Sequence, residues 1–153
     1  MIKVLFVCHG NICRSPMAEF LFKEYLKEKG AADGFYIESA ATSAEELDNP
    51  VYPPVKRMLD GLKIDCSKKR ARLLLSSDYD KFDYLIGMDE KNVRNMKNFF
   101  GGDKDGKIYK LLDFTTENGG KEVADPWYTG DFERTKRDVL LGIDGFYKYI
   151  VKN

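Results

Sequence analysis

The chain has 153 residues, with 25 lysines and arginines against 25 aspartates and glutamates, and three cysteines. This length suits one domain, residues 1–153, with a proper hydrophobic core, while the absence of a basic excess argues against a general nucleic-acid or membrane-surface binder. The odd cysteine count, and the lack of any stretch resembling a secretion signal or a membrane span, favour free thiols and a cytoplasmic protein.

Apolar strands and amphipathic helices alternate along the chain. Residues 2–7 are an almost unbroken apolar run, which is typical of a strand buried on both faces of a parallel sheet. A helical pattern then begins at Ser15-Pro16 and stops at Gly30. The same patterns predict, in order, a strand over 35–37, a loop over 39–54, a helix over 55–62, a strand over 82–88, a helix through about 99, a strand over 108–112, a long polar loop holding 125–128 and a helix over 132–150. This alternation predicts an α/β fold in three layers, a doubly wound parallel sheet flanked by helices, with ligands bound at the carboxyl ends of strands.

The segment between the first strand and the first helix opens with Cys8 and closes with Arg14. A tight loop over residues 9–13 can turn its N–H groups inward as a nest for an anion. Gly10 and Asn11 tolerate the left-handed backbone that such a curl needs. Arginine grips two phosphate oxygens at once, and a thiol at a helix N-terminus beside a cation has a lowered pKa. The segment therefore predicts a phosphate-binding loop with a thiolate nucleophile beneath it.

The surroundings of this loop strengthen the prediction. Ser15 is positioned to donate a hydrogen bond to the Cys8 sulfur and to cap the helix. The plainer interpretation is a buried cysteine at a strand end and an arginine on a solvated turn. A cysteine and an arginine at this spacing are a weak signal alone, but the preceding strand, the internal Gly-Asn and the immediate helix favour the phosphate site.

At VCHGNICRSPMAE, residues 7–19, the chain resembles the low-molecular-weight protein tyrosine phosphatases. The resemblance extends over nearly the whole chain and includes, in the family's order, Ser39 to Thr42, Arg70-Ala71-Arg72, Phe82-Asp83, Met88-Asp89 and Asp125-Pro126-Trp127-Tyr128. It implies a four-stranded parallel sheet wrapped by helices, and hydrolysis of phosphotyrosine through a phosphocysteine intermediate.

The resemblance also implies a role for each residue of the loop. Cys8 is the expected nucleophile, Arg14 the clamp on the phosphate and the transition state, and Ser15 the stabiliser of the thiolate. Cys13 matches a second cysteine that can pair with the nucleophile on oxidation and shield it from irreversible damage, so redox regulation is expected. The residues expected to surround the bound phosphate are His9, Gly10, Asn11, which braces the loop, Ile12 and Cys13.

Asp125 is the expected general acid. From the residues alone, Asp-Pro in a polar loop predicts a turn. The resemblance instead implies that Asp125 protonates the leaving phenolate and then activates water as a base. Trp127 and Tyr128 are expected to line a slot for a flat ring, with ordinary packing as the alternative. Because Cys8 must be ionised and Asp125 protonated, we expect the rate to peak below neutral pH and, with no metal or cofactor involved, to survive EDTA.

Three positions depart from the family's pattern, and a fourth bears on substrate choice. Glu45 stands where an aromatic is usual, Ala41 where glycine is usual, and Lys69 where histidine is common in the brace behind the loop. Glu45 is therefore a substrate-contacting residue of changed character, and we predict a preference for phosphotyrosine flanked by basic residues. The apolar Ile12 resembles the tyrosine-directed members, whereas arginine-directed relatives tend to carry threonine there.

The sequence also allows other classes of function. A zinc site built from His9 and the three cysteines matches no familiar ligand spacing. A thioredoxin-coupled arsenate reductase shares the loop but needs a later cysteine pair, and only Cys66 follows, which suits a small buried hydrophobe. A protein arginine phosphatase and a silent phosphate-binding or adaptor protein are further alternatives. We predict a monomeric phosphatase that acts on phosphotyrosine proteins, releases inorganic phosphate and binds neither nucleic acid nor membrane.

Overall fold

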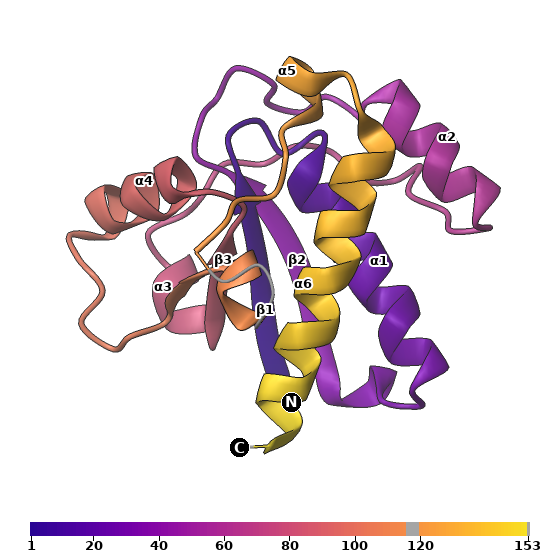
Figure 1. Ribbon diagram of the computed structural model, residues 1–153. Coiled ribbons are helices and arrows are strands. Elements are labelled where there is room, and N and C mark those ends of the chain that lie inside the picture. The colour runs from indigo at the N-terminus through magenta and orange to yellow at the C-terminus, as the bar shows by residue number, and fades with distance from the viewer. Residues whose placement is uncertain (116–119, 153) are drawn as a thin grey trace.

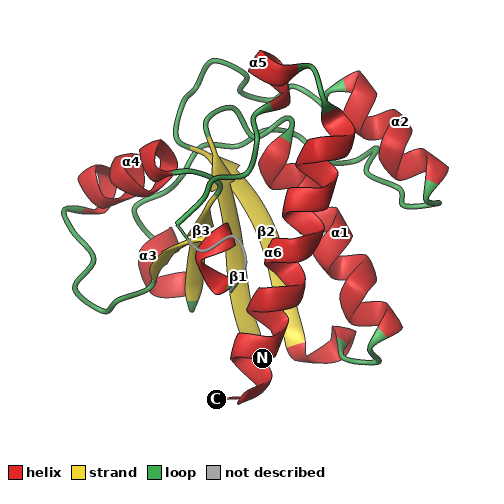
Figure 2. Cartoon of the chain, viewed as in Figure 1, coloured by secondary structure: helices red, strands yellow, loops and turns green. Residues whose placement is uncertain are grey.

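Four parallel strands form one sheet through the centre of the molecule (Figures 1 and 2). The computed structural model describes residues 1–115 and 120–152. The strands are β1 (Ile2–Cys8), β2 (Phe35–Ala41), β3 (Tyr84–Gly87) and β4 (Ile108–Lys110), in the order β2-β1-β3-β4. All three pairings are parallel, which confirms the predicted α/β architecture.

Helices cover both faces of the sheet, as Figure 1 shows. The helices α1 (Arg14–Glu28) and α6 (Phe132–Lys152) pack on one face, and α3 (Asp78–Lys81) and α4 (Glu90–Phe100) on the other. The helix α2 (Pro53–Gly61) joins the core through Val55 and Leu59. No helix within the described ranges combines the length and the apolar character needed to cross a membrane.

The side chains of β1 explain why its sequence is continuously apolar. Val4 and Phe6 belong to the cluster on the side of α1 and α6, where the Phe6 ring meets Phe22 edge to face at 5.9 Å. Leu5 and Val7 belong to the cluster on the side of α3 and α4. Alternate residues of a strand point to opposite faces, and both faces are covered here, so every position in the middle of β1 is apolar.

Several elements differ in extent from the sequence prediction. β2 continues to Ala41, because its parallel pairing with β1 runs as far as Cys8 opposite Ala41, so the predicted loop begins three residues too early. The predicted strand over 108–112 ends at Lys110 and passes into the 3₁₀ turn η2 (Leu111–Phe114). The one-turn helix α3 and the 3₁₀ turn η1 (Ala32–Gly34) lack a sequence signal. Residues 116–119 of the predicted polar loop, and residue 153, lie outside the described residues.

The position of β1 between β2 and β3 determines where a site can form. After β1 the chain moves toward one sheet edge to make β2, and after β2 it crosses back to make β3 on the other side of β1. In doubly wound sheets such a switch point opens a crevice beyond the carboxyl ends of the strands. Cys8 is the last residue of β1 and therefore stands at the base of that crevice.

Candidate active site

The loop between β1 and α1 curls around the sulfur of Cys8, which is almost fully buried. Asn11 adopts φ of +60° and its N–H points at Cys8 Sγ, 3.3 Å away. The N–H groups of Gly10, Ile12 and Cys13 have no hydrogen-bond acceptor within residues 1–115 and 120–152. A tight loop of backbone donors around a sulfur is an anion nest, as the sequence predicted.

Asn11 braces the loop from behind. Its side-chain amide donates to Ser15 Oγ at 2.8 Å and to Ser39 Oγ at 2.9 Å, and its carbonyl oxygen accepts the Arg72 N–H at 3.1 Å. Ser15 Oγ in turn lies 3.0 Å from Cys8 Sγ. One buried amide therefore holds the loop, the first turn of α1, β2 and the segment after residue 69 in a fixed relation.

The prediction that Ser15 caps α1 is wrong. The helix begins at Arg14 and its N-cap residue is Cys13, with no side-chain capping bond. Ser15 therefore lies inside the first turn. Its hydroxyl does contact the Cys8 sulfur, the hydrogen-bond partner that the sequence predicted.

A second layer behind Asn11 is ionic. Ser39 Oγ donates to Glu19 Oε1 at 2.5 Å, and Lys69 Nζ lies 3.4 Å from the same oxygen while donating to the Ser39 carbonyl at 2.8 Å. Lys23 approaches the other Glu19 oxygen at 2.7 Å. Burial lowers the pKa of Lys69, an effect that Glu19 only partly opposes. Lys69 thus occupies the brace behind the loop, where its charge is offset by a buried carboxylate.

Arg14 is held over the loop by three oxygen atoms. Its Nη1 donates to Asp89 Oδ2 at 2.9 Å and to the Val123 carbonyl at 3.2 Å, and its Nη2 lies 3.4 Å from Asp125 Oδ2. Burial acts to lower the pKa of Arg14, yet the charges of Cys8 and the two carboxylates raise it above its ordinary value. The guanidinium is therefore a fixed, permanent cation beside the sulfur.

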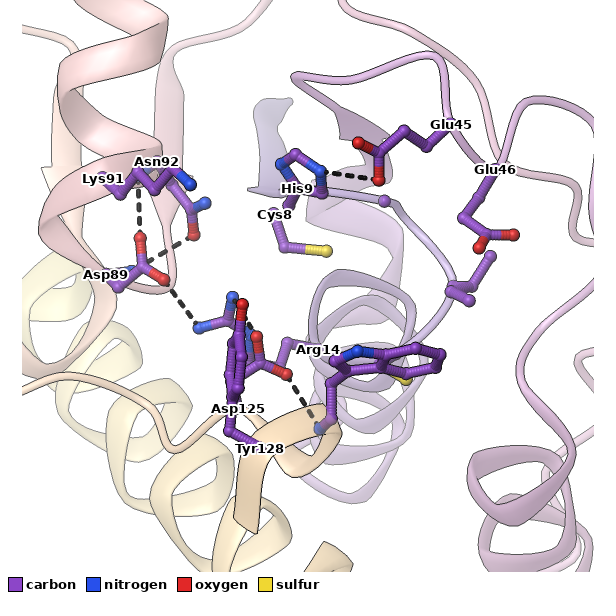
Figure 3. Close-up of a pocket in the computed structure, with 14 residues that line it drawn as sticks. Cys8, His9, Arg14, Glu45, Glu46, Asp89, Lys91, Asn92, Asp125 and Tyr128 are labelled. Carbon is purple, nitrogen blue, oxygen red and sulfur yellow. Dashed lines mark hydrogen bonds and ion pairs between the residues drawn. The ribbon is translucent and has the colours of Figure 1, made fainter. Parts of the chain in front are cut away.

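Asp125 begins a one-turn helix, α5 (Pro126–Thr129), where the residues alone predicted a turn. Its Oδ1 accepts the Trp127 N–H at 3.0 Å, so Asp125 is the N-cap residue. Pro126 occupies the first helical position, which suits its fixed φ. The cap turns the other carboxylate oxygen, Oδ2, toward Arg14 and the pocket (Figure 3).

A pocket of about 450 Å³ opens above the sulfur (Figure 3). Among the predicted site residues, all but Asn11 and Ser15 line it, and those two support it from behind. Trp127 and Tyr128 remain 66% and 85% exposed, with the Trp127 ring 5.9 Å from that of Tyr52. Ordinary core packing therefore does not account for these two aromatic side chains.

Sequence reasoning missed four of the residues that line the pocket: Glu46, Asp89, Lys91 and Asn92. Asp89 follows β3, the neighbour of β1, so the rule that parallel strands end at one edge could have placed it beside the loop. It also caps α4 by accepting the Asn92 N–H at 2.7 Å, which leaves its Oδ2 for Arg14.

The cysteines differ in their surroundings. Cys13 lines the pocket with Cys8, and burial, followed by the charge of Cys8, raises its pKa to about 12. Cys66 is buried and does not line the pocket. All three thiols are free. Among the residues that the structure describes, no three His, Cys, Asp or Glu side chains gather in an arrangement suited to a metal ion.

Comparisons with known proteins agree with this geometry. Residues 3–153 match the model of the family described as low molecular weight phosphotyrosine protein phosphatase. The chain is 35% identical over 152 residues to the low molecular weight protein-tyrosine-phosphatase YfkJ of Bacillus subtilis, covering 99% of this chain and 97% of that protein.

Solved structures give the same result. The crystal structure of YfkJ superposes with a TM-score of 0.94, covering 99% of this chain and 96% of that one. That of SP-PTP, a low molecular weight protein tyrosine phosphatase from Streptococcus pyogenes, is 40% identical with a TM-score of 0.85, covering 97% and 93%. A drosophila arginine phosphatase, at 24% identity and a TM-score of 0.86 over 97% and 98%, shares the fold.

Proposed function

The chain belongs to the low-molecular-weight phosphotyrosine protein phosphatase family, and we propose that it hydrolyses phosphotyrosine in proteins through a phosphocysteine on Cys8. The observation that carries this proposal is the convergence on one sulfur of an anion nest, a fixed guanidinium and a carboxyl group. Cys8 Sγ lies at the base of the pocket, with Arg14 beside it and Asp125 3.4 Å from the guanidinium (Figure 3).

The reaction takes two displacements at phosphorus. In the first, Cys8 Sγ forms a bond to phosphorus while the bond to the phenolic oxygen breaks, and Asp125 gives its proton to that oxygen. In the second, water attacks phosphorus, Asp125 takes the proton from the water, and the sulfur–phosphorus bond breaks to release inorganic phosphate. Arg14 and the loop N–H groups stabilise the charge on the phosphoryl oxygens throughout.

The pocket walls support an aromatic ester as substrate. Ile12, Trp127 and Tyr128 surround the space above the loop, and their apolar surfaces favour a flat ring over the short chain of phosphoserine. The Tyr52 ring behind Trp127 lies 5.9 Å from it and supports one wall. A phosphoarginine has no aromatic ring to fill this slot, which is why we place tyrosine first.

The setting of the enzyme is part of the proposal. We infer that residues 1–153 act as one monomeric domain in the cytoplasm, without metal or cofactor, and that Cys13 protects Cys8 by forming a disulfide under oxidation. Three free thiols are consistent with a reducing compartment. Cys13 shares the pocket with Cys8, which supports the protective role.

A panel of phosphotyrosine, phosphoserine and phosphoarginine peptides tests the proposal, with phosphate release as the readout. Phosphotyrosine should be hydrolysed fastest. Cys8→Ser should abolish turnover while phosphotyrosine peptide still binds. Asp125→Ala should lower kcat about 10²–10⁴-fold with phenyl phosphate and much less with esters whose leaving groups need no proton. Turnover by Cys8→Ser would exclude the thiolate mechanism, and faster release from phosphoarginine would exclude tyrosine as the preferred substrate.

A further inference from the structure

Charged side chains of opposite sign stand on opposite sides of the pocket mouth (Figure 3). Glu45 and Glu46, hereafter the acidic rim, lie on the loop after β2. Lys91 lies in the first turn of α4, across the pocket. These three residues line the pocket, but none takes part in the proposed bond-making steps.

The charged side chains deeper in the pocket are paired with one another. Arg14 is matched by Asp89 and Asp125. Glu46 accepts a hydrogen bond from the neutral amide of Asn49 at 2.6 Å, which brings no opposite charge beside it.

The side chains of Glu45 and Lys91 are also open to a ligand. The Glu45 side chain is 71% exposed, and within the described residues its one side-chain partner is His9, at 3.1 Å. Lys91 is exposed, and its ammonium has no ion pair or hydrogen bond within residues 1–115 and 120–152. The mouth therefore has a negative and a positive side.

A peptide bound through its phosphotyrosine must cross this mouth. An extended chain advances about 3.3 Å per residue, so residues one or two positions from the phosphotyrosine reach the rim when the ring fills the pocket. A phosphate brought beside the acidic rim is repelled unless a cation on the peptide lies there too. Lys91 attracts a carboxylate on the other flank by the same rule.

We propose that this polarity makes the enzyme selective for phosphotyrosine peptides with a basic residue on one flank and an acidic residue on the other, and that it sets the direction in which the peptide lies. The inference rests on the proposed phosphotyrosine hydrolysis. It goes further than a preference for basic flanks, because it distinguishes two peptides of equal composition and equal net charge.

Two isomeric peptides test the inference. One carries Lys two residues before phosphotyrosine and Glu two residues after it, and the other has these two residues exchanged. Exposed ion pairs are weak, so we expect kcat/KM at low salt to differ by about two- to fivefold between the isomers. The difference should shrink as salt rises, because exposed charges are screened.

Variants identify the residues responsible. Within each variant the ratio of kcat/KM for the two isomers cancels any general change in activity. The ratio should fall toward one in the Glu45→Gln, Glu46→Gln double variant and in Lys91→Gln, whereas exposed Lys104→Gln, which does not line the pocket, should keep the wild-type ratio.

The possible results separate the two proposals. Equal kcat/KM for the isomers in the wild type, or a wild-type ratio in both rim variants, would overturn the directional inference while leaving phosphotyrosine hydrolysis intact. Failure of the wild type to hydrolyse either peptide would overturn the proposed function, and the directional inference with it.

Discussion

Replacing Asn11 by alanine should cost more stability than most single substitutions, because the residue acts through both its side chain and its backbone. The side chain is 1% exposed and makes three hydrogen bonds, to Ser15, Ser39 and Arg72. The backbone stands at φ of +60°, a region that asparagine tolerates better than alanine. Alanine thus loses the bonds and bears more backbone strain than asparagine does.

The loss can be worked out from these contacts. Each net hydrogen bond contributes about 1 kcal/mol, and the left-handed backbone adds about 1 kcal/mol for alanine. We therefore expect Asn11→Ala to lower the free energy of unfolding by about 4 kcal/mol, a large part of the 5–15 kcal/mol that is typical of native domains. Because the same amide holds Ser15 against Cys8, kcat/KM should fall at least about tenfold even where the variant is folded.

A glycine variant separates the two contributions. Asn11→Gly loses the same side-chain bonds but accepts positive φ, so it should be about 0.5–1 kcal/mol more stable than Asn11→Ala. Exposed Asn98→Ala serves as the control, with a change within about 0.5 kcal/mol. Urea unfolding at equilibrium gives the stabilities. A loss below about 1 kcal/mol for Asn11→Ala, or a glycine variant no more stable than the alanine variant, would refute the reasoning.

Two further predictions concern packing and thiol ionisation. A Cβ at Gly142 would meet Leu111 Cγ at 2.4 Å, so Gly142→Ala should lower the free energy of unfolding in urea by about 1–3 kcal/mol. Gly61→Ala, whose Cβ meets nothing within 4 Å, serves as the control and should not destabilise the protein. Equal unfolding midpoints for the two variants would contradict this. Because burial raises the pKa of Cys13 to about 12, its thiol is almost wholly protonated at pH 8. Iodoacetamide should therefore label Cys13 far more slowly in the native than in the urea-unfolded protein, and the native rate should rise with pH. Equal labelling of Cys13 in native and unfolded protein, located by fragment-ion mass because Cys8 and Cys13 share one tryptic peptide, would exclude the raised pKa.

What the sequence predicted well is local. Three contiguous segments could each be predicted from their own residue types: the buried β1, the loop from Cys8 to Arg14 and the start of α1. The apolar run of β1 needs both faces covered, and both are. Gly10 and Asn11 predicted a tight curl with left-handed backbone; Asn11 adopts the positive φ, whereas Gly10 does not.

What the sequence did not predict depends on contacts between distant segments. Asp89 touches Arg14 across 75 positions of sequence, and the Val123 carbonyl does so across 109. No local pattern marks a carboxylate that must face an arginine at the start of a distant helix. The early end assigned to β2 has the same origin. Pairing with β1 keeps residues 39–41 extended, although serine and alanine lack the β-branched or aromatic side chains that mark a strand.

The structure separates the chemistry of the site from its choice of substrate. Asn11 and Arg14 are buried and each is held by several partners, so a change at either one disturbs the loop around Cys8. The rim residues, such as Glu45 and Tyr128, are exposed and carry few contacts, so substitutions there cost little stability. Glu45 can therefore vary while the phosphate loop stays intact. We accordingly expect substrate preference to change through rim residues such as Glu45 and Glu46 rather than through the loop.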